Sequence, residues 1–324
     1  MIKVGLIGIG GIGTVHFNSY KNISNAEVVA VADIRVDMAK EKLKDYPNIH
    51  IYSSLEALLA NENVDMVDIC TPTYMHADMS VYALEHRVHV ICEKPMAMTS
   101  ADANRMAEAA NRSGKLFMIA HVIRFMLPYI YLKQTVDSAE LGKPLQLEFK
   151  RLSHIPEWSW ENWMRDRKKS GGSLLDLSIH DLDFVQYVFG KPIKVSSVYR
   201  KLQNNSDFVV SELIYDGMIT TVTGAFYTTP NFPFLPSYFA VFEGGYLSYK
   251  GGKLLKNGEE IDLNDASVLS DTNINISNVA GHQREIQYFV DCIEKGNTPE
   301  IVTPESACDT IVLIERLLNN CTEV

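Results

Sequence analysis

The first 33 residues constrain the fold of this chain more than any other stretch. A largely apolar run, 3–7, leads into Gly8, Gly10 and Gly13, and a segment of helical composition follows. In the order strand, tight turn, helix, such glycines permit the turn, let the main chain approach a pyrophosphate, and let helix and strand pack closely. The free N–H groups at the start of the helix would also face the phosphates. The stretch therefore predicts a dinucleotide-binding unit.

A second strand-like run supplies the acidic residue that such a unit needs. Residues 28–32 are apolar and end at Asp33, twenty residues beyond Gly13, where a carboxylate accepts hydrogen bonds from the ribose hydroxyls. A carboxylate there repels a 2′-phosphate and favours NAD over NADP, whereas Arg35 could pair with a phosphate. The residues after Gly13 lack the Gly-Lys-Ser/Thr of a nucleotide-triphosphatase loop. The predicted cofactor contacts in this region are Gly8, Gly10, Gly11, Ile12, Gly13, Asp33 and Arg35.

Composition narrows the class of protein. A length of 324 residues exceeds the usual single core and predicts two domains. A formal charge of −10 argues against nucleic acid or an anionic membrane as partner. Five scattered cysteines without a C-x-x-C pair predict reduced thiols and a cytoplasmic protein. Glycines interrupt any signal-peptide core at the start, and prolines and threonines interrupt the longest uncharged run, 217–242, so no membrane span is expected.

The two halves of the chain have different patterns. Residues 1–121 alternate β-branched runs with helical segments, which predicts an N-terminal Rossmann domain with a doubly wound parallel sheet. Residues 122–324 favour an α+β substrate-binding and oligomerisation domain with a largely antiparallel open sheet. The predicted fold class is therefore α/β. The expected strands are 2–7, 28–32, 49–52, 66–70, 89–92 and 116–120, then 145–150, 195–199, 208–215, 218–227 and 239–242; the expected helices include 54–60, 75–86, 100–113 and 173–189.

The uncharged stretch 217–242 also bears on assembly. It is rich in threonine and aromatic residues, so a partner sheet could bury its strands. We therefore expect a homodimer or homotetramer formed through the C-terminal sheet.

Polar residues follow three of the predicted parallel strands, at the edge where such sheets bind ligands. Thr71, Pro72 and His76 follow 66–70, Glu93 and Lys94 follow 89–92, and His121 and Arg124 follow 116–120. A lysine at a strand end that faces the cofactor could polarise a hydroxyl or carbonyl oxygen, although a surface lysine that happens to precede proline is the simpler alternative. From its position we favour a functional Lys94. Thr71, Pro72, His76, Glu93 and Lys94 complete the predicted cofactor contacts.

The predicted helix 173–189 carries Asp176 and His180 four residues apart, hence on one face. A carboxylate beside an imidazole orients the ring and raises its basicity, which suits a general base near neutral pH. Such pairs also occur as surface or capping pairs. Asp176, His180 and Asp181 could bind a metal, but the spacing indicates no further ligand, so no metal is predicted.

All three tryptophans lie in 158–163, where they could be core anchors or the wall of a pocket that fits the C–H faces of a sugar ring. Two arginines of the expected substrate site, Arg124 and Arg165, are compatible with an acidic or a nucleotide-linked sugar. The candidate substrate contacts are His121, Arg124, His154, Trp158, Trp163 and Arg165.

Taken together, these motifs resemble the Gfo/Idh/MocA family of sugar and cyclitol oxidoreductases over nearly the whole chain. The matching residues are Gly8-x-Gly10-x-x-Gly13, Asp33, Cys70-Thr71-Pro72 with His76, Glu93-Lys94-Pro95, Arg124, Asp176-x-x-x-His180, and the stretches 285–289 and 296–307. The resemblance implies that Lys94, Asp176 and His180 form the catalytic group. It implies that His180 removes a hydroxyl proton while a hydride passes from the same carbon to the nicotinamide, with Asp176 orienting the imidazole and Lys94 binding the reacting oxygen.

The expected function is thus an NAD-dependent dehydrogenase of a sugar, cyclitol or nucleotide sugar. One alternative is an enzyme that keeps its cofactor bound and passes hydride between two sugars. Another is a regulatory protein that senses NAD or a sugar without turnover. Such a protein would be expected to lose the lysine or the Asp/His pair, whereas this chain retains Lys94, Asp176 and His180.

Overall fold

The computed structural model describes residues 1–157, 159–263 and 281–324. They form two compact units, the first from 1–121 with 281–311 and the second from 122–263 with 312–324. The sequence-based boundary assigned 281–311 to the second domain, whereas the structure packs them with the first. The reason is α10 (Gly281–Lys295), which lies against α1 (Gly11–Tyr20) and buries Ile286, Phe289 and Val290 in the first unit. No helix of the described segments is both long and apolar enough to cross a bilayer.

The first unit contains a six-stranded parallel sheet in the order β3-β2-β1-β4-β5-β6. The chain moves outward from β1 to β3 and then returns to continue from β4 to β6, so the topology reverses between β1 and β4. This confirms the predicted doubly wound fold, in which ligands bind beside that reversal. The strands are β1 Ile2–Ile7, β2 Ala26–Ala32, β3 His50–Tyr52, β4 Met66–Ile69, β5 His89–Glu93 and β6 Phe117–Ala120.

Local signals set the helices of this unit. The Thr99 side chain caps α5 by accepting the N–H of Asp102, and Gly114 ends it with a left-handed φ of 66°. These caps explain why the predicted helix 100–113 agrees with the structure. The helices besides α1 and α10 are α2 Val36–Lys42, α3 Leu55–Asn61, the 3-10 helix η1 Thr73–Met75, α4 His76–Glu85 and α5 Ser100–Ser113.

The second unit contains a nine-stranded mixed sheet in the order β14-β13-β12-β11-β7-β10-β9-β8-β15. Only the β7–β10 and β8–β15 neighbours pair in parallel, which confirms the predicted α+β domain with a largely antiparallel sheet. Strands β12 to β15 were not predicted. The strands are β7 Pro144–His154, β8 Lys194–Lys201, β9 Asp207–Tyr215, β10 Met218–Tyr227, β11 Leu235–Phe242, β12 Gly245–Lys250, β13 Lys253–Lys256, β14 Glu259–Glu260 and β15 Cys321–Glu323.

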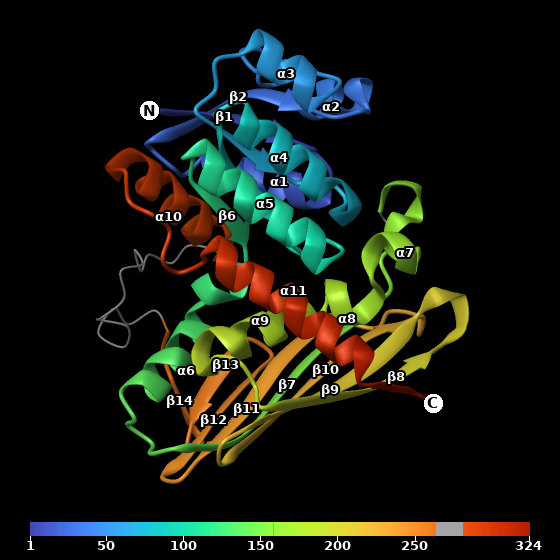
Figure 1. The fold of residues 1–324 in the computed structure, drawn as a ribbon, viewed down its shortest axis with the longest axis vertical. Helices are drawn as coiled ribbons and strands as arrows, with labels where there is room; N and C mark the ends of the chain where they lie inside the picture. Colours follow the sequence, from blue (N-terminus) through green and yellow to red (C-terminus); the bar gives the residue numbers. More distant parts are fainter. Residues whose placement is uncertain (158, 264–280) are drawn as a thin grey trace. The chain divides into compact units, whose positions relative to one another are not determined.

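The two faces of this sheet differ. Helices α8 (Gly172–Asp176) and α9 (Ser178–Phe189) lie along one face (Figure 1). Side chains such as Phe149 and Val222 are buried in this sheet. The strand register places Val198, Val210, Ile219 and Phe239 on the opposite face. These four side chains are 37–47% exposed. The remaining helices of this part of the chain are η2 Val122–Phe125, α6 Leu127–Asp137, η3 Trp160–Arg165, α7 Arg167–Ser170, η4 Gln203–Asn205 and α11 Pro304–Asn319, which begins in the first unit.

The predicted single helix 173–189 is wrong at one point, because the structure divides it at Leu177 into α8 and α9. The His180 N–H donates to Leu177 O, three residues back. The junction packs tightly against Gly224 of β10, where an added Cβ would overlap Ser178 Oγ. Asp176 therefore ends one helix and His180 lies in the next. The prediction that the two residues share one face of a single helix, four residues apart, does not apply.

Candidate functional site

The glycine turn is sterically required. Gly8 has a φ of +88°, and a Cβ there would lie 2.7 Å from Cys70 O. A Cβ on Gly13 would overlap Gly8 O, so α1 can approach the end of β1 this closely only with glycine at position 13. At Gly10 the nearest heavy atom to a built Cβ is 3.9 Å away, which leaves open space before the helix. Because Gly11 and Ile12 begin α1, their N–H groups precede its first helical bonds, and this arrangement fits a pyrophosphate.

Asp33 is anchored beside this turn at the end of β2. Its Oδ2 accepts the Ile9 N–H at 3.0 Å, and its Oδ1 accepts the Arg35 N–H at 2.8 Å. Arg35 Nε lies 3.4 Å from the same Oδ1, and its guanidinium is the group nearest to the open side of Gly10. Asp33 and Arg35 therefore lie next to each other beside the glycine turn.

Lys42 is a second cation at this edge, which the sequence analysis did not identify. Its Nζ donates to Ile9 O at 2.8 Å and to Thr14 Oγ1 at 3.1 Å, bridging α2 to the glycine turn. Burial lowers the pKa of Lys42, as does the charge of Arg35, while Asp33 acts in the opposite direction. Lys42 lies late in α2, and nothing local in the sequence connects it with the turn.

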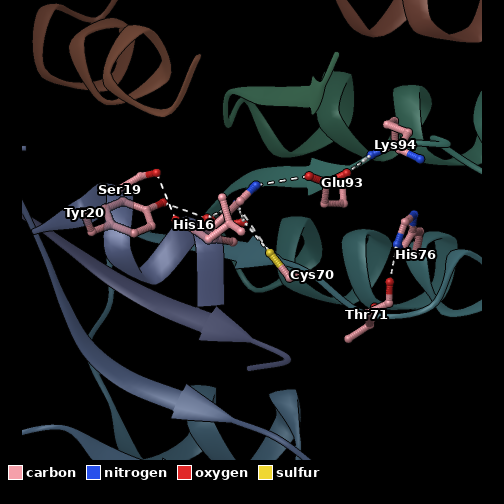
Figure 2. A network of polar contacts seen from close by, with 10 residues as sticks. His16, Ser19, Tyr20, Cys70, Thr71, His76, Glu93 and Lys94 are labelled. Carbon is pink, nitrogen blue, oxygen red and sulfur yellow. Dashed lines mark hydrogen bonds and ion pairs between the residues drawn. The ribbon is translucent and has the colours of Figure 1, made fainter. Parts of the chain in front are cut away.

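His76 joins the segments that follow β4 and β5. Its Nε2 lies 2.8 Å from Thr71 O and its Nδ1 lies 2.8 Å from Pro95 O, and the ring is buried (Figure 2). Burial lowers the pKa of His76, while the two carbonyl contacts act to raise it. Pro72 precedes the 3-10 helix that leads to this ring. The imidazole thereby ties together the two strand ends on which Thr71 and Lys94 lie.

Glu93, the last residue of β5, is the other anchor of Lys94. Its Oε2 accepts the Lys94 backbone N–H at 3.0 Å, and its Oε1 lies 3.1 Å from His16 Nε2 (Figure 2). Burial opposes ionisation of Glu93, but the hydrogen bond and charge of His16 outweigh it, and the pKa of Glu93 is lowered to about 2. Glu93 is therefore a carboxylate at neutral pH, held between an imidazole and the backbone of the lysine.

A buried polar cluster of His16, Tyr20, Asp68, Cys70 and Glu93 extends from this anchor, and we call it the His16 cluster. His16 Nδ1 lies 2.9 Å from Asp68 Oδ2, and the Tyr20 hydroxyl donates to the same oxygen at 3.0 Å. Cys70 Sγ lies 3.4 Å from His16 Nδ1. The sequence analysis missed this cluster. The available signal was Asp68, a charge within an apolar buried strand, which requires a partner.

The cluster contains a possible metal-ligand set, because ligand atoms of His16, Asp68 and Cys70 lie within 4.8 Å of one another. Their separations are those of hydrogen bonds. Burial raises the pKa of Cys70. The chemistry of these donors therefore fits a hydrogen-bonded network better than a metal site.

The predicted residues of the second unit have different environments. Asp176 is buried at the end of α8, and His180 is half-buried in the first turn of α9. Arg124 pairs with Asp183 through Nε at 2.8 Å and Nη2 at 2.6 Å, and both side chains are buried. This pair fixes α9 to η2, which gives Arg124 a structural task besides the predicted contact with substrate.

The other candidate substrate contacts are dispersed over both units. His121 is buried directly after β6, in the first unit. In the second unit, His154 Nδ1 lies 2.8 Å from Ile155 O, and Arg165 donates to Glu157 at 2.6 Å. Trp163 is half-buried in η3, and Trp158 lies outside the described residues.

Comparison with known proteins agrees with this arrangement. Residues 2–121 match a family model described as an oxidoreductase family with an NAD-binding Rossmann fold. Residues 129–246 match the GFO/IDH/MocA C-terminal domain. The chain belongs to the GFO/IDH/MocA family. The resemblance found in the sequence motifs is confirmed.

Individual relatives share part of the sequence. Myo-inositol 2-dehydrogenase of Thermotoga maritima is 31% identical over 193 residues, which are 60% of this chain and 56% of that protein. D-glucoside 3-dehydrogenase of Escherichia coli is 32% identical over 192 residues, 59% of this chain and 55% of that protein. The matched region thus spans little more than half of these relatives. The solved structure of myo-inositol 2-dehydrogenase from Lactobacillus plantarum has the same fold, with a TM-score of 0.81 at 19% identity over 98% of this chain and 96% of that one.

Glu285 of α10 is a buried carboxyl group beside the His16 cluster. Neither of its oxygens has a hydrogen-bond partner among the described residues, and the side chain is fully buried. Burial raises the pKa of Glu285 well above its ordinary value, and the charges of Glu93 and Asp68 add to this, whereas His16 acts in the opposite direction. Burial without a hydrogen-bond partner therefore favours the protonated form of Glu285 in the folded protein.

Replacing Glu285 by Gln should stabilise the protein in a pH-dependent way. Above about pH 4.3 the unfolded chain loses this proton while the folded chain keeps it, so the wild-type free energy of unfolding falls as pH rises. Gln has no such proton to lose. We expect E285Q to raise the free energy of unfolding by about 1 kcal/mol or more at pH 8, with the gain shrinking towards about pH 4.

Calorimetric melting at both pH values would measure this difference. Glu41, which is 75% exposed, provides the control variant E41Q, for which no comparable pH-dependent gain is expected. A loss of stability in E285Q that is equal at both pH values would contradict a buried, protonated Glu285.

Proposed function

We propose that this chain is an NAD-dependent dehydrogenase that oxidises a CH–OH carbon of a sugar, cyclitol or nucleotide sugar. The observation that carries the proposal is the carboxyl edge of one parallel sheet, where the glycine turn, Asp33 and the Lys94 segment all lie. Family membership supports it, because relatives are named inositol and glucoside dehydrogenases. The same edge would serve an enzyme that retains its cofactor between two sugar substrates.

The cofactor would be held by the residues around the glycine turn. The N–H groups at the start of α1 suit the pyrophosphate, Asp33 suits the ribose hydroxyls, and the ends of β4 and β5 supply Thr71 and Lys94. When bound, NAD supplies the hydride acceptor. We propose NAD over NADP because Asp33 is a fixed carboxylate whose charge opposes a 2′-phosphate, although Arg35 and Lys42 add positive charge nearby.

For the chemistry, we propose His180 as the general base that takes the proton of the reacting hydroxyl. Asp176 would orient the imidazole, and the Lys94 ammonium would hydrogen-bond the reacting oxygen. The support is that Lys94 lies on a backbone held by the Glu93 carboxylate, and that α9 is fixed by buried ion pairs at Asp181 and Asp183. Retention of all three groups favours catalysis over a ligand-sensing role.

We also propose a homodimer or homotetramer formed through the C-terminal sheet. Its support is the sheet face that carries Val198, Val210, Ile219 and Phe239, since exposed apolar side chains on one face of a sheet suit a second copy of the same surface. A cytoplasmic location is proposed from the cysteines, all five of which are free thiols in the structure.

Alanine variants test the catalytic assignment. A panel of sugars, inositols, sugar acids and UDP-sugars, followed by NADH absorbance, would identify a substrate. On it, His180→Ala and Lys94→Ala should each lower kcat about 100-fold or more while NADH still binds, since each removes a group that acts on the reacting oxygen. His50, which is 65% exposed, provides the control H50A. Near-normal turnover in both H180A and K94A would refute the assignment.

Asp33 determines the predicted cofactor preference. The wild-type protein should bind NADH more tightly than NADPH in fluorescence titrations. Asp33→Ser removes the repelling charge and leaves Arg35 and Lys42, so it should weaken NADH and strengthen NADPH, shifting the ratio of dissociation constants about tenfold or more. Tighter NADPH binding by the wild type would overturn the preference.

The exposed sheet face can be tested by light scattering after size-exclusion chromatography. The wild type should have the mass of a dimer or tetramer at micromolar concentration. The double variant Val210→Lys/Ile219→Lys should be monomeric, because it places charges within an apolar contact. Leu318→Lys alters a comparably exposed leucine of α11 and should leave the mass unchanged. A monomeric wild type would contradict the proposal.

A further inference from the structure

His16 has a carboxylate at each ring nitrogen. Nδ1 lies 2.9 Å from Asp68 Oδ2 and Nε2 lies 3.1 Å from Glu93 Oε1, so the ring bridges β4 and β5 from α1 (Figure 2). Ionised carboxylates only accept hydrogen bonds, and a neutral imidazole donates from one nitrogen alone. Both contacts are satisfied together only when His16 is an imidazolium. A buried positive charge between two negative charges is the arrangement that burial tolerates best.

The groups around the ring are consistent with that charge. Asp68 raises the pKa of His16 well above its ordinary value against the opposing effect of burial. The Tyr20 hydroxyl, on α1, donates to Asp68. The thiol of Cys70, directly after β4, lies beside Nδ1 of His16. From α10, burial raises the pKa of Glu285. The centroid of the His282 ring, also on α10, lies 5.9 Å from that of His16, and burial lowers the pKa of His282.

The bridge continues to Lys94. The Glu93 carboxylate that accepts from His16 through Oε1 accepts the Lys94 N–H through Oε2. On the other side of the lysine, His76 contacts the carbonyl of Pro95. We propose that His16 is a positioning residue for Lys94: by fixing the Glu93 carboxylate, it fixes the backbone from which the lysine side chain extends. The proposal rests on the catalytic role proposed above for Lys94.

Loss of the ring would have a definite consequence. Without the imidazolium, the buried carboxylates of Asp68 and Glu93 would no longer be neutralised, and one of them would have to bind a proton or turn away. Glu93 ends its strand and is bonded to the next residue, so a change in its orientation is passed to Lys94. Asp68 lies within β4 and retains Tyr20 as donor.

The variant His16→Gln tests this inference, with Tyr20→Phe as the matched control. Y20F removes a hydrogen bond to Asp68 from the same cluster but leaves the His16–Glu93 bridge intact. The primary readout is the rate at which acetic anhydride acetylates Lys94 in the full chain, measured by peptide mass spectrometry relative to the exposed Lys44. Because loss of the ring releases the Glu93 carboxylate that holds the Lys94 backbone, H16Q should change this rate about threefold or more, and Y20F should change it less than about twofold.

Turnover supplies the second readout. H16Q should lower kcat about tenfold or more while KM and the NADH dissociation constant change less than about threefold, since a misplaced lysine affects the reacting oxygen more than binding. If His16 acts through Glu93, the double variant H16Q/E93Q should be no slower than E93Q alone, because groups that act as one unit are not additive. A purely structural role would lower stability without this non-additivity.

Either of two results would overturn the inference: Lys94 reactivity in H16Q equal to that of the wild type, or losses in kcat that multiply in H16Q/E93Q. If H16Q does not fold, E93Q alone carries the test, because it retains His16 but removes the charge that links it to Lys94; an unchanged Lys94 reactivity there would be equally decisive. Normal turnover in K94A would reject the proposed catalytic role of Lys94, whereas the acetylation rate would still show whether His16 positions the lysine.

Discussion

The close approach of Gly13 to Gly8 is the constraint on which the first unit depends. Because no Cβ separates them, α1 lies directly against the carboxyl ends of β1 and β4. Three residues after Gly13, His16 can then reach Asp68 and Glu93 across the sheet. The same turn places Ile9 N–H on Asp33. One steric requirement thus sets both the predicted ribose carboxylate and the buried bridge behind Lys94.

Much of the fold could be predicted because its determinants are local. Strands of a parallel sheet are buried on both faces, so they are continuous apolar runs in the sequence. Helix α5 has a threonine cap and a terminal glycine within its own segment. The glycine spacing and Asp33 also belong to one continuous unit. For these elements, local preference and tertiary structure agree, and the sequence was sufficient.

The remainder depends on contacts between residues far apart in the sequence. The division of the expected helix at Leu177 follows from packing against Gly224, and the place of α10 in the first unit follows from its fit on α1. Lys42 and His16 carry no motif of their own; their roles appear only when the fold brings a carbonyl or two carboxylates to them. Asp68 was the exception, since a charge inside an apolar strand already implies a partner.

Buried ion pairs support the proposed reactive groups in both units. In the first, His16 lies between two carboxylates, one of which holds the Lys94 backbone. In the second, Asp181 and Asp183 pair with Arg151 and Arg124, and both carboxylates lie within three residues of His180 on α9. Such pairs add little net stability, yet removing one partner leaves the other charge buried without a partner, which is strongly unfavourable. Their advantage is geometric: a helix or strand end held by a buried charge has few alternative positions, which is what a general base and an oxygen-binding lysine require.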